Sequence, residues 1–149
     1  MKKIAIVPVA AAAAVLAAGA LGASSEKFGL SATLVKGGEP GAIHAPANAR
    51  GSFTGTLNTT SEKRTIRWKL TYSHLSGAAF AAHIHKGRPG VAGPVIVPLC
   101  GPCHSGQTGT ATVTAAIAKA IRAGNTYVNV HTTKNKNGEI RGQLKASHS

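Results

Sequence analysis

Apolar and polar residues alternate with a period of two through most of the chain after residue 24. The clearest alternation covers residues 65–75, and its apolar members are Ile66, Trp68, Leu70 and Tyr72. Because successive side chains of a strand point to opposite faces, this run predicts a strand with one buried and one wet face. Trp68 and Tyr72 are therefore expected in the core, and Arg67 and Lys69 in water.

Similar alternation, interrupted by turn residues, predicts about eight short strands. They cover residues 27–35, 51–57, 65–75, 78–85, 95–97, 108–114, 126–133 and 138–144. Residues 115–123 carry apolar side chains at helical spacing and precede Gly124, which predicts one short helical connection. Asn137-Gly138 is a hairpin signal between the last two strands. The expected fold is all-β, an antiparallel β-sandwich or Greek-key barrel.

The first 23 residues have a pattern of their own. A basic start, an alanine-rich apolar run and the small residues Ala18-Gly19-Ala20 are typical of a secretory signal peptide with its cleavage site. An uncleaved membrane anchor is the alternative. We therefore expect residues 1–23 to be a signal peptide and residues 24–149 a single exported domain. Its location would be secreted, periplasmic or otherwise extracytoplasmic, with no membrane span after cleavage.

The charge balance narrows the class of partner. The chain has 17 Lys and Arg against 4 acidic residues, none of them aspartate. Two of the lysines lie in the signal peptide, so the exported part carries 15 − 4 = +11. This favours an anionic cell-envelope polymer or another extracellular protein as partner, unless the charge serves only solubility. Nucleic acid is not expected, because the chain is exported and has few aromatic residues for base stacking.

Two apolar runs carry histidines. His83 and His85 are two residues apart, so both should project from one face of their strand, with Phe80, Ala82 and Ile84 on the other. His131 is expected on the matching outer face of the strand at residues 126–133. Pairing the two strands would bring three imidazoles together.

Three neutral imidazoles suit copper, and less well zinc, and would leave a coordination position open. A fourth ligand could come from His74 or His104. The alternative is a structural cluster in which the histidines bond to Asn129, Thr132 and backbone groups, with no metal bound.

Cys100 and Cys103 flank Gly-Pro in a turn-rich segment. In an oxidising compartment a local disulfide is expected, and metal ligation with His104 or redox exchange are the alternatives. Without aspartate, no Ser-His-Asp triad can form. Glu139 and Arg141 are two residues apart and are expected to form a surface ion pair.

Four motifs carry a family resemblance. They are Ala-His-Ile-His-Lys-Gly (82–87), Gly-Pro-Val (93–95), Tyr-Val-Asn-Val-His-Thr (127–132) and Gly-Glu-Ile-Arg-Gly-Gln-Leu (138–144). Together they resemble the CHRD family over roughly residues 27–145. That domain occurs alone in many secreted bacterial proteins, and the resemblance implies an extracellular β domain without naming an activity.

The histidine pattern is also similar to copper,zinc superoxide dismutase. That resemblance implies His83, His85 and His131 as copper ligands and Arg141 as the residue that attracts the anionic substrate. The chain departs from that family in lacking aspartate for a zinc site, the bridging-histidine loop and the long-range cysteine pair.

The sequence thus predicts an exported, non-catalytic CHRD-type binding module whose histidines can hold a metal. A copper-dependent oxidoreductase and a cationic module that binds anionic envelope polymers are the alternatives.

Overall fold

The structure, a computed structural model, describes residues 24–36 and 44–149. The expected signal peptide, residues 1–23, lies outside the described residues. The described elements are β1 (Glu26–Lys36), β2 (Arg50–Thr59), β3 (Arg64–Ser73), β4 (Ala79–Lys86), β5 (Val95–Cys100), β6 (Gln107–Thr112), α1 (Ala115–Arg122), β7 (Thr126–Thr132), β8 (Ile140–Gln143) and β9 (Lys145–His148). The expected all-β fold with one short helix is confirmed. In this described part of the chain, no helix has the length and apolar character needed to cross a membrane.

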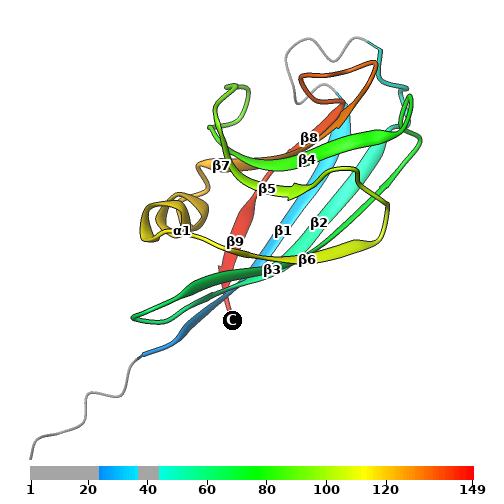
Figure 1. The fold of residues 1–149 in the computed structure, drawn as a ribbon. Coiled ribbons are helices and arrows are strands. Elements are labelled where there is room, and N and C mark those ends of the chain that lie inside the picture. The colour runs from blue at the N-terminus through cyan, green and yellow to red at the C-terminus, as the bar shows by residue number, and fades with distance from the viewer. Residues whose placement is uncertain (1–23, 37–43) are drawn as a thin grey trace, which may run out of the picture.

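All the strands belong to one antiparallel sheet in the order β5-β4-β7-β8-β1-β2-β3-β6. β8 and β9 follow each other along β1, β8 at the Lys36 end and β9 beside residues 28–31. The sheet curls until its edge strands β5 and β6 approach each other, so that a nearly closed barrel results (Figure 1). One half of this barrel is β5-β4-β7-β8, and the other is β9 with β1-β2-β3-β6. The chain crosses between them from β3 to β4, from β5 to β6, from β6 to β7 through α1, and from β8 to β9.

The inward side chains of both halves form one hydrophobic core, as the alternation predicts. Ile66, Trp68 and Leu70 of β3 are buried, and Trp68 stacks on Phe53 with ring centroids 6.5 Å apart. Tyr72 is only partly buried, because its hydroxyl reaches the surface turn and donates to the Cys103 carbonyl at 2.8 Å. The prediction for Trp68 is confirmed, and Tyr72 is a core-edge residue.

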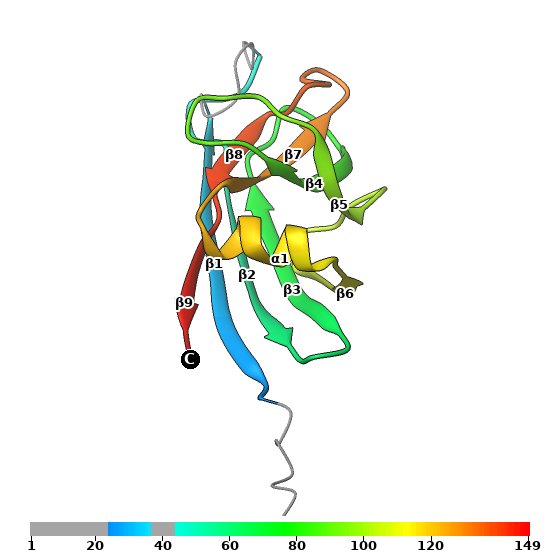
Figure 2. The ribbon, with the colours of Figure 1, turned by 90° about the vertical axis from the view of Figure 1, so that its left-hand side faces the viewer.

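Helix α1 covers an opening of the barrel (Figure 2). The Thr114 hydroxyl accepts a hydrogen bond from the Ile117 amide, which caps the start of the helix. Ala118 and Ile121 are its buried residues, and Gly124 follows the helix at a φ of 69°. That left-handed conformation suits glycine and ends the helix where the sequence indicates.

Strand β9 is the element that the sequence does not predict. Its residues show no regular apolar alternation, and it pairs only with β1. It exists because Leu144, fully buried, fixes the chain in the core just before it and directs it along β1.

Candidate metal centre

Strands β4 and β7 bring the three expected histidines together. Their register places Ala81 opposite His131, His83 opposite Asn129 and His85 opposite Tyr127. Directly opposed residues of an antiparallel pair share a face, so the three imidazoles project from one side. The other side of the pair is core, with Ala82, Ile84, Val128 and Val130 buried. The predicted division of these two strands into a core face and an outer face is confirmed for those residues.

Phe80 departs from that partition. It was expected on the core side with Ala82, but a register shift between Ala79 and Ala81 turns it outward. Phe80 is 43% exposed, and its ring lies 5.9 Å from the His131 ring, centroid to centroid. The expectation for Phe80 is therefore wrong, because a bulge moves a side chain to the other face. Phe80 borders the outer edge of the histidine cluster.

The three imidazoles are close enough to share one ion. One ligand atom from each of His83, His85 and His131 lies within 4.8 Å of the other two. The Nδ1 atom of His83 is 3.0 Å from the Nε2 atom of His131. Two nitrogens bound to one tetrahedral metal at about 2.0–2.1 Å are roughly 3.3 Å apart, so this pair already has nearly the required spacing.

Backbone carbonyls fix the orientation of two of the rings. The Nδ1 atom of His85 lies 2.8 Å from the Gly93 carbonyl oxygen, and the Nδ1 atom of His131 lies 2.8 Å from that of Lys136. A carbonyl only accepts, so each Nδ1 carries a proton, and in the neutral ring the lone pair is then on Nε2. A metal-binding histidine typically donates its second N–H in this way. Both rings thus present Nε2 to the cluster.

The two Nε2 atoms differ in what faces them. In the neutral cluster the Nε2 of His131 accepts from His83, whereas the Nε2 of His85 is buried with no hydrogen-bond partner in the described part of the chain. His85 is only 8% exposed, so water does not readily satisfy this nitrogen. An unpartnered buried acceptor is costly, and a bound cation would remove the cost.

The third ring, His83, is held in its neutral form. Burial, together with repulsion from His131 and His85, lowers the pKa of His83 from 6.5 to about 4. Metals bind neutral imidazole, so at neutral pH this ring can bind a metal without a net loss of a proton. For its Nδ1 to be the ligand, the hydrogen that it donates to His131 would have to move to Nε2. His83 is also the most exposed of the three and leaves a side of the cluster open to solvent.

The loop from Gly87 to Pro94 covers His85. A Cβ on Gly93 would lie 1.7 Å from the Lys86 carbonyl oxygen, so only glycine lets the loop close this tightly. The amide of Lys86 donates to the Pro94 carbonyl at 3.0 Å, and that of Gly93 donates to the Tyr127 hydroxyl at 3.1 Å. These bonds place the Gly93 carbonyl against the His85 ring.

The hairpin between β7 and β8 covers His131 and depends on Glu139. This carboxylate is fully buried and accepts hydrogen bonds from the Ser76 amide and from the side chains of Ser76, Thr132 and Asn135. Burial raises the pKa of Glu139, but these bonds outweigh it and hold the pKa below its usual value. The hairpin that supplies the Lys136 carbonyl is thereby fixed to the barrel.

The expected surface ion pair between Glu139 and Arg141 is wrong. Both residues are buried, and Arg141 is only 3% exposed. The Arg141 guanidinium packs 3.3 Å from the centre of the Tyr127 ring and donates to the carbonyls of Arg88 and Val91 at 2.9 Å. The covering loop and hairpin bury what the alternation alone marks as a wet face, so all of β7 is buried.

Arg141 therefore holds the covering loop. Its guanidinium is hydrogen-bonded to loop carbonyls. An anion in solution could contact the guanidinium only if that loop moved. Sequence reasoning also missed three supporting groups, Tyr127, Gly93 and the Lys136 carbonyl. The sequence marks these segments only by Gly-Pro at 93–94 and Asn-Gly at 137–138. These pairs indicate turns, but they do not show that the turns contact the histidines.

The other predicted site residues lie apart from the cluster. The group that could hold a metal within residues 24–36 and 44–149 consists of His83, His85 and His131, without His74 or His104. Both of those are exposed; the His74 ring contacts the Ser73 hydroxyl. Cys100 and Cys103 are joined in the expected local disulfide.

The fold and site define a small antiparallel β-barrel domain with a half-buried histidine cluster on its β4–β7 face. The CHRD domain family matches residues 30–144, which is most of the chain. The protein belongs to the CHRD domain family. Domains of this family are typically extracellular. Searches of curated proteins and of solved structures gave no match.

Proposed function

We propose that this protein is an exported, non-catalytic CHRD-domain module that binds one copper ion through His83, His85 and His131. The observation that carries the proposal is the buried, unpartnered Nε2 of His85, aimed from a ring whose Nδ1 is fixed by the Gly93 carbonyl. A structural cluster would be expected to satisfy that nitrogen.

The chemistry of the donors favours copper over zinc. The set is three neutral imidazoles, with no thiolate or carboxylate among the described residues of the cluster. Nitrogen donors bind Cu²⁺ more tightly than the other divalent ions of the first transition row. The neutral set also suits Cu⁺, which tolerates low coordination numbers. Zinc is the weaker candidate.

The test is a copper and zinc titration of the exported domain, with electron paramagnetic resonance of the copper form. Stoichiometric binding and a nitrogen-rich spectrum are expected. Both should disappear in His83→Ala, His85→Ala and persist in the matched double variant His74→Ala, His104→Ala, which removes two exposed imidazoles. Circular dichroism establishes that each variant is folded. Equal copper binding by the two double variants would contradict the proposal.

A copper-dependent oxidoreductase is the second candidate function. Three protein ligands leave a coordination position open, and the partial exposure of His83 supports access to it. Superoxide consumption that is lost on chelation and restored by copper alone would favour this activity. Stoichiometric copper without such consumption would favour the non-catalytic module.

A further inference from the structure

The opposite half of the barrel presents a face of a different chemistry. Opposed residues on β9, β1, β2, β3 and β6 form two continuous rows across the sheet. The first row is Lys145, Ser31, Thr54, Lys69 and Thr108. The second row is Ser147, Gly29, Thr56, Arg67 and Thr110. Because directly opposed residues share a face, each row projects outward together, and we call the two rows the hydroxyl face.

The hydroxyl face is cationic and has no compensating carboxylate in either row. Lys69, Arg67 and Lys145 are exposed on it. Of the three described acids, Glu26 pairs with Arg122 at 3.1 Å, Glu139 is buried in its own network, and Glu62 is exposed in the turn between β2 and β3, outside both rows. Among the described residues, none of the three cations of this face forms a salt bridge, so they can attract an anionic partner.

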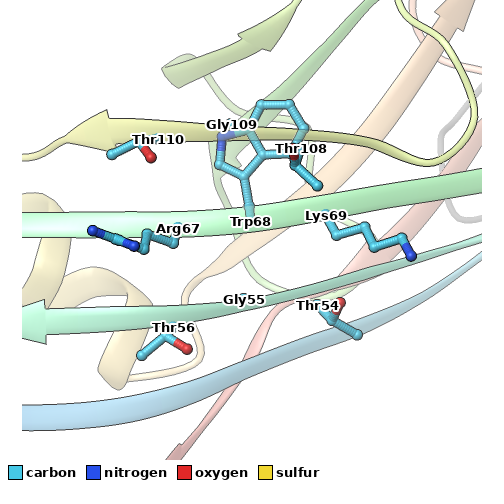
Figure 3. Close-up of a pocket in the computed structure, with 9 residues that line it drawn as sticks. All are labelled: Thr54, Gly55, Thr56, Arg67, Trp68, Lys69, Thr108, Gly109 and Thr110. Carbon is cyan, nitrogen blue, oxygen red and sulfur yellow. The ribbon is translucent and has the colours of Figure 1, made fainter.

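A hollow separates the two rows (Figure 3). Gly55 and Gly109 flank Trp68 there, and the side chains of Arg67 and Lys69 extend to either side of it. The hollow is open to solvent and has a volume of about 560 Å³. A Cβ on Gly109 would lie 2.4 Å from the Trp68 ring, so the strand can lie flat over the indole only with glycine at this position. On the outward side of the sheet, the threonines of both rows line a shallow surface between the two cations.

We propose that the hydroxyl face binds an acidic polysaccharide chain. Arg67 and Lys69 are two residues apart, about 7 Å along the strand, and Lys145 lies three strands from Lys69, about 14 Å across the sheet. One extended polyanionic chain lying across the sheet could therefore contact several of these cations at once. The threonine hydroxyls between them can both donate to and accept from sugar hydroxyls.

Other classes of anionic partner fit this face less well. Neither row contains an aromatic side chain on which a nucleic acid base could stack. Neither row contains a large apolar side chain that could enter a lipid surface. The inference is independent of the metal centre, which lies on the β4–β7 half of the sheet.

The experiment measures binding of the protein to polygalacturonate at low ionic strength. The variant Arg67→Gln, Lys69→Gln should bind roughly tenfold more weakly. The variant Lys119→Gln, Lys134→Gln removes the same charge from exposed positions on α1 and the β7–β8 hairpin, and it should bind nearly as the unchanged protein does. Equal losses in the two variants, or no binding to polygalacturonate, would overturn the proposal.

Two comparisons separate a glycan site from charge alone. Polyglutamate offers carboxylates without sugar hydroxyls, so it should bind more weakly than polygalacturonate. Thr54→Val, Thr108→Val keeps side-chain shape, and it should weaken binding to polygalacturonate several-fold but leave polyglutamate unaffected. Equal affinity for both polymers, or tighter binding to duplex DNA or anionic vesicles, would refute the glycan assignment. His83→Ala, His85→Ala should bind the polymer unchanged, which separates this test from that of the metal centre.

Discussion

The imidazole of His85 lies face to face with the phenol of Tyr127, with ring centroids 4.9 Å apart and ring planes 12° apart. The Arg141 guanidinium also packs on that phenol. His85 is thus held on its face by Tyr127 and at Nδ1 by Gly93, before any metal is present. The orientation of this candidate ligand is built into the fold.

Replacing Tyr127 by phenylalanine tests this support. The ring and its stacking remain, but the hydroxyl that accepts a hydrogen bond from the Gly93 amide is lost. We expect a loss of about 1 kcal/mol in the free energy of unfolding and about tenfold weaker copper binding. Chemical denaturation and a competitive copper titration measure the two. Unchanged copper affinity would show that the loop does not orient His85.

Gly93→Ala tests the close approach of the covering loop. Its Cβ would lie 1.7 Å from a backbone oxygen, which cannot move without shifting the strand. We expect destabilisation of about 2–4 kcal/mol, seen as a lower midpoint of thermal unfolding. Gly77→Ala is the matched control, since its Cβ would meet only the Thr133 hydroxyl at 3.6 Å. Equal midpoints for the two variants would contradict the tight loop.

Glu139→Gln tests the clamp on the hairpin. The variant loses the charge that strengthens four hydrogen bonds, and we expect a cost of about 2–3 kcal/mol at neutral pH. The pKa of Glu139 is lower in the folded than in the unfolded protein, so the unfolded state takes up the proton first as pH falls. This stabilisation is therefore complete above the unfolded pKa, about 4.3, and is lost as pH falls through the lower folded pKa.

Denaturant titrations from pH 7 to pH 2 check this dependence. The unchanged protein should lose stability in the acid range more steeply than Glu139→Gln does. Glu62→Gln, which removes an exposed glutamate, should follow the unchanged protein. Parallel curves for all three proteins would argue against a stabilising carboxylate.

His83 should make the stability of the metal-free protein depend on pH in a second range. Its pKa is lowered from 6.5 to about 4 on folding, so between these values the unfolded state binds the proton and the folded state does not. Stability should therefore fall as pH decreases from about 6.5 to about 4. His83→Gln should flatten the curve in that window, and His74→Gln, at an exposed position, should leave it unchanged. Denaturant midpoints measured with a chelator present provide the check.

The alternation of apolar and polar residues was sufficient to predict every described strand except β9, and the convergence of the histidines. Ile66, Trp68 and Leu70 enter the core as their spacing requires. Residues two apart share a face in any strand, so His83 and His85 had to project together. The match to the CHRD domain family agrees with the motifs around these strands.

The environment of that face could not be predicted. The alternation places Glu139 and Arg141 on the outer, polar face. It does not show that loops cover this face in the folded protein. Their burial depends on hydrogen bonds to residues far away in sequence, such as Ser76, and on carbonyls of Arg88 and Val91. The outward turn of Phe80 depends on a bulge that leaves no mark in the order of the residues.

Lys136 contributes its carbonyl oxygen, not its exposed side chain, to the contact that orients His131. Natural variation at position 136 should then be nearly unrestricted, provided the hairpin keeps its shape. Conversely, Asn135 and Glu139, which never touch an imidazole in the contacts described, should resist substitution as strongly as the histidines. Relatives that share this centre are thus better recognised by the residues that shape the turn than by the residue at its tip.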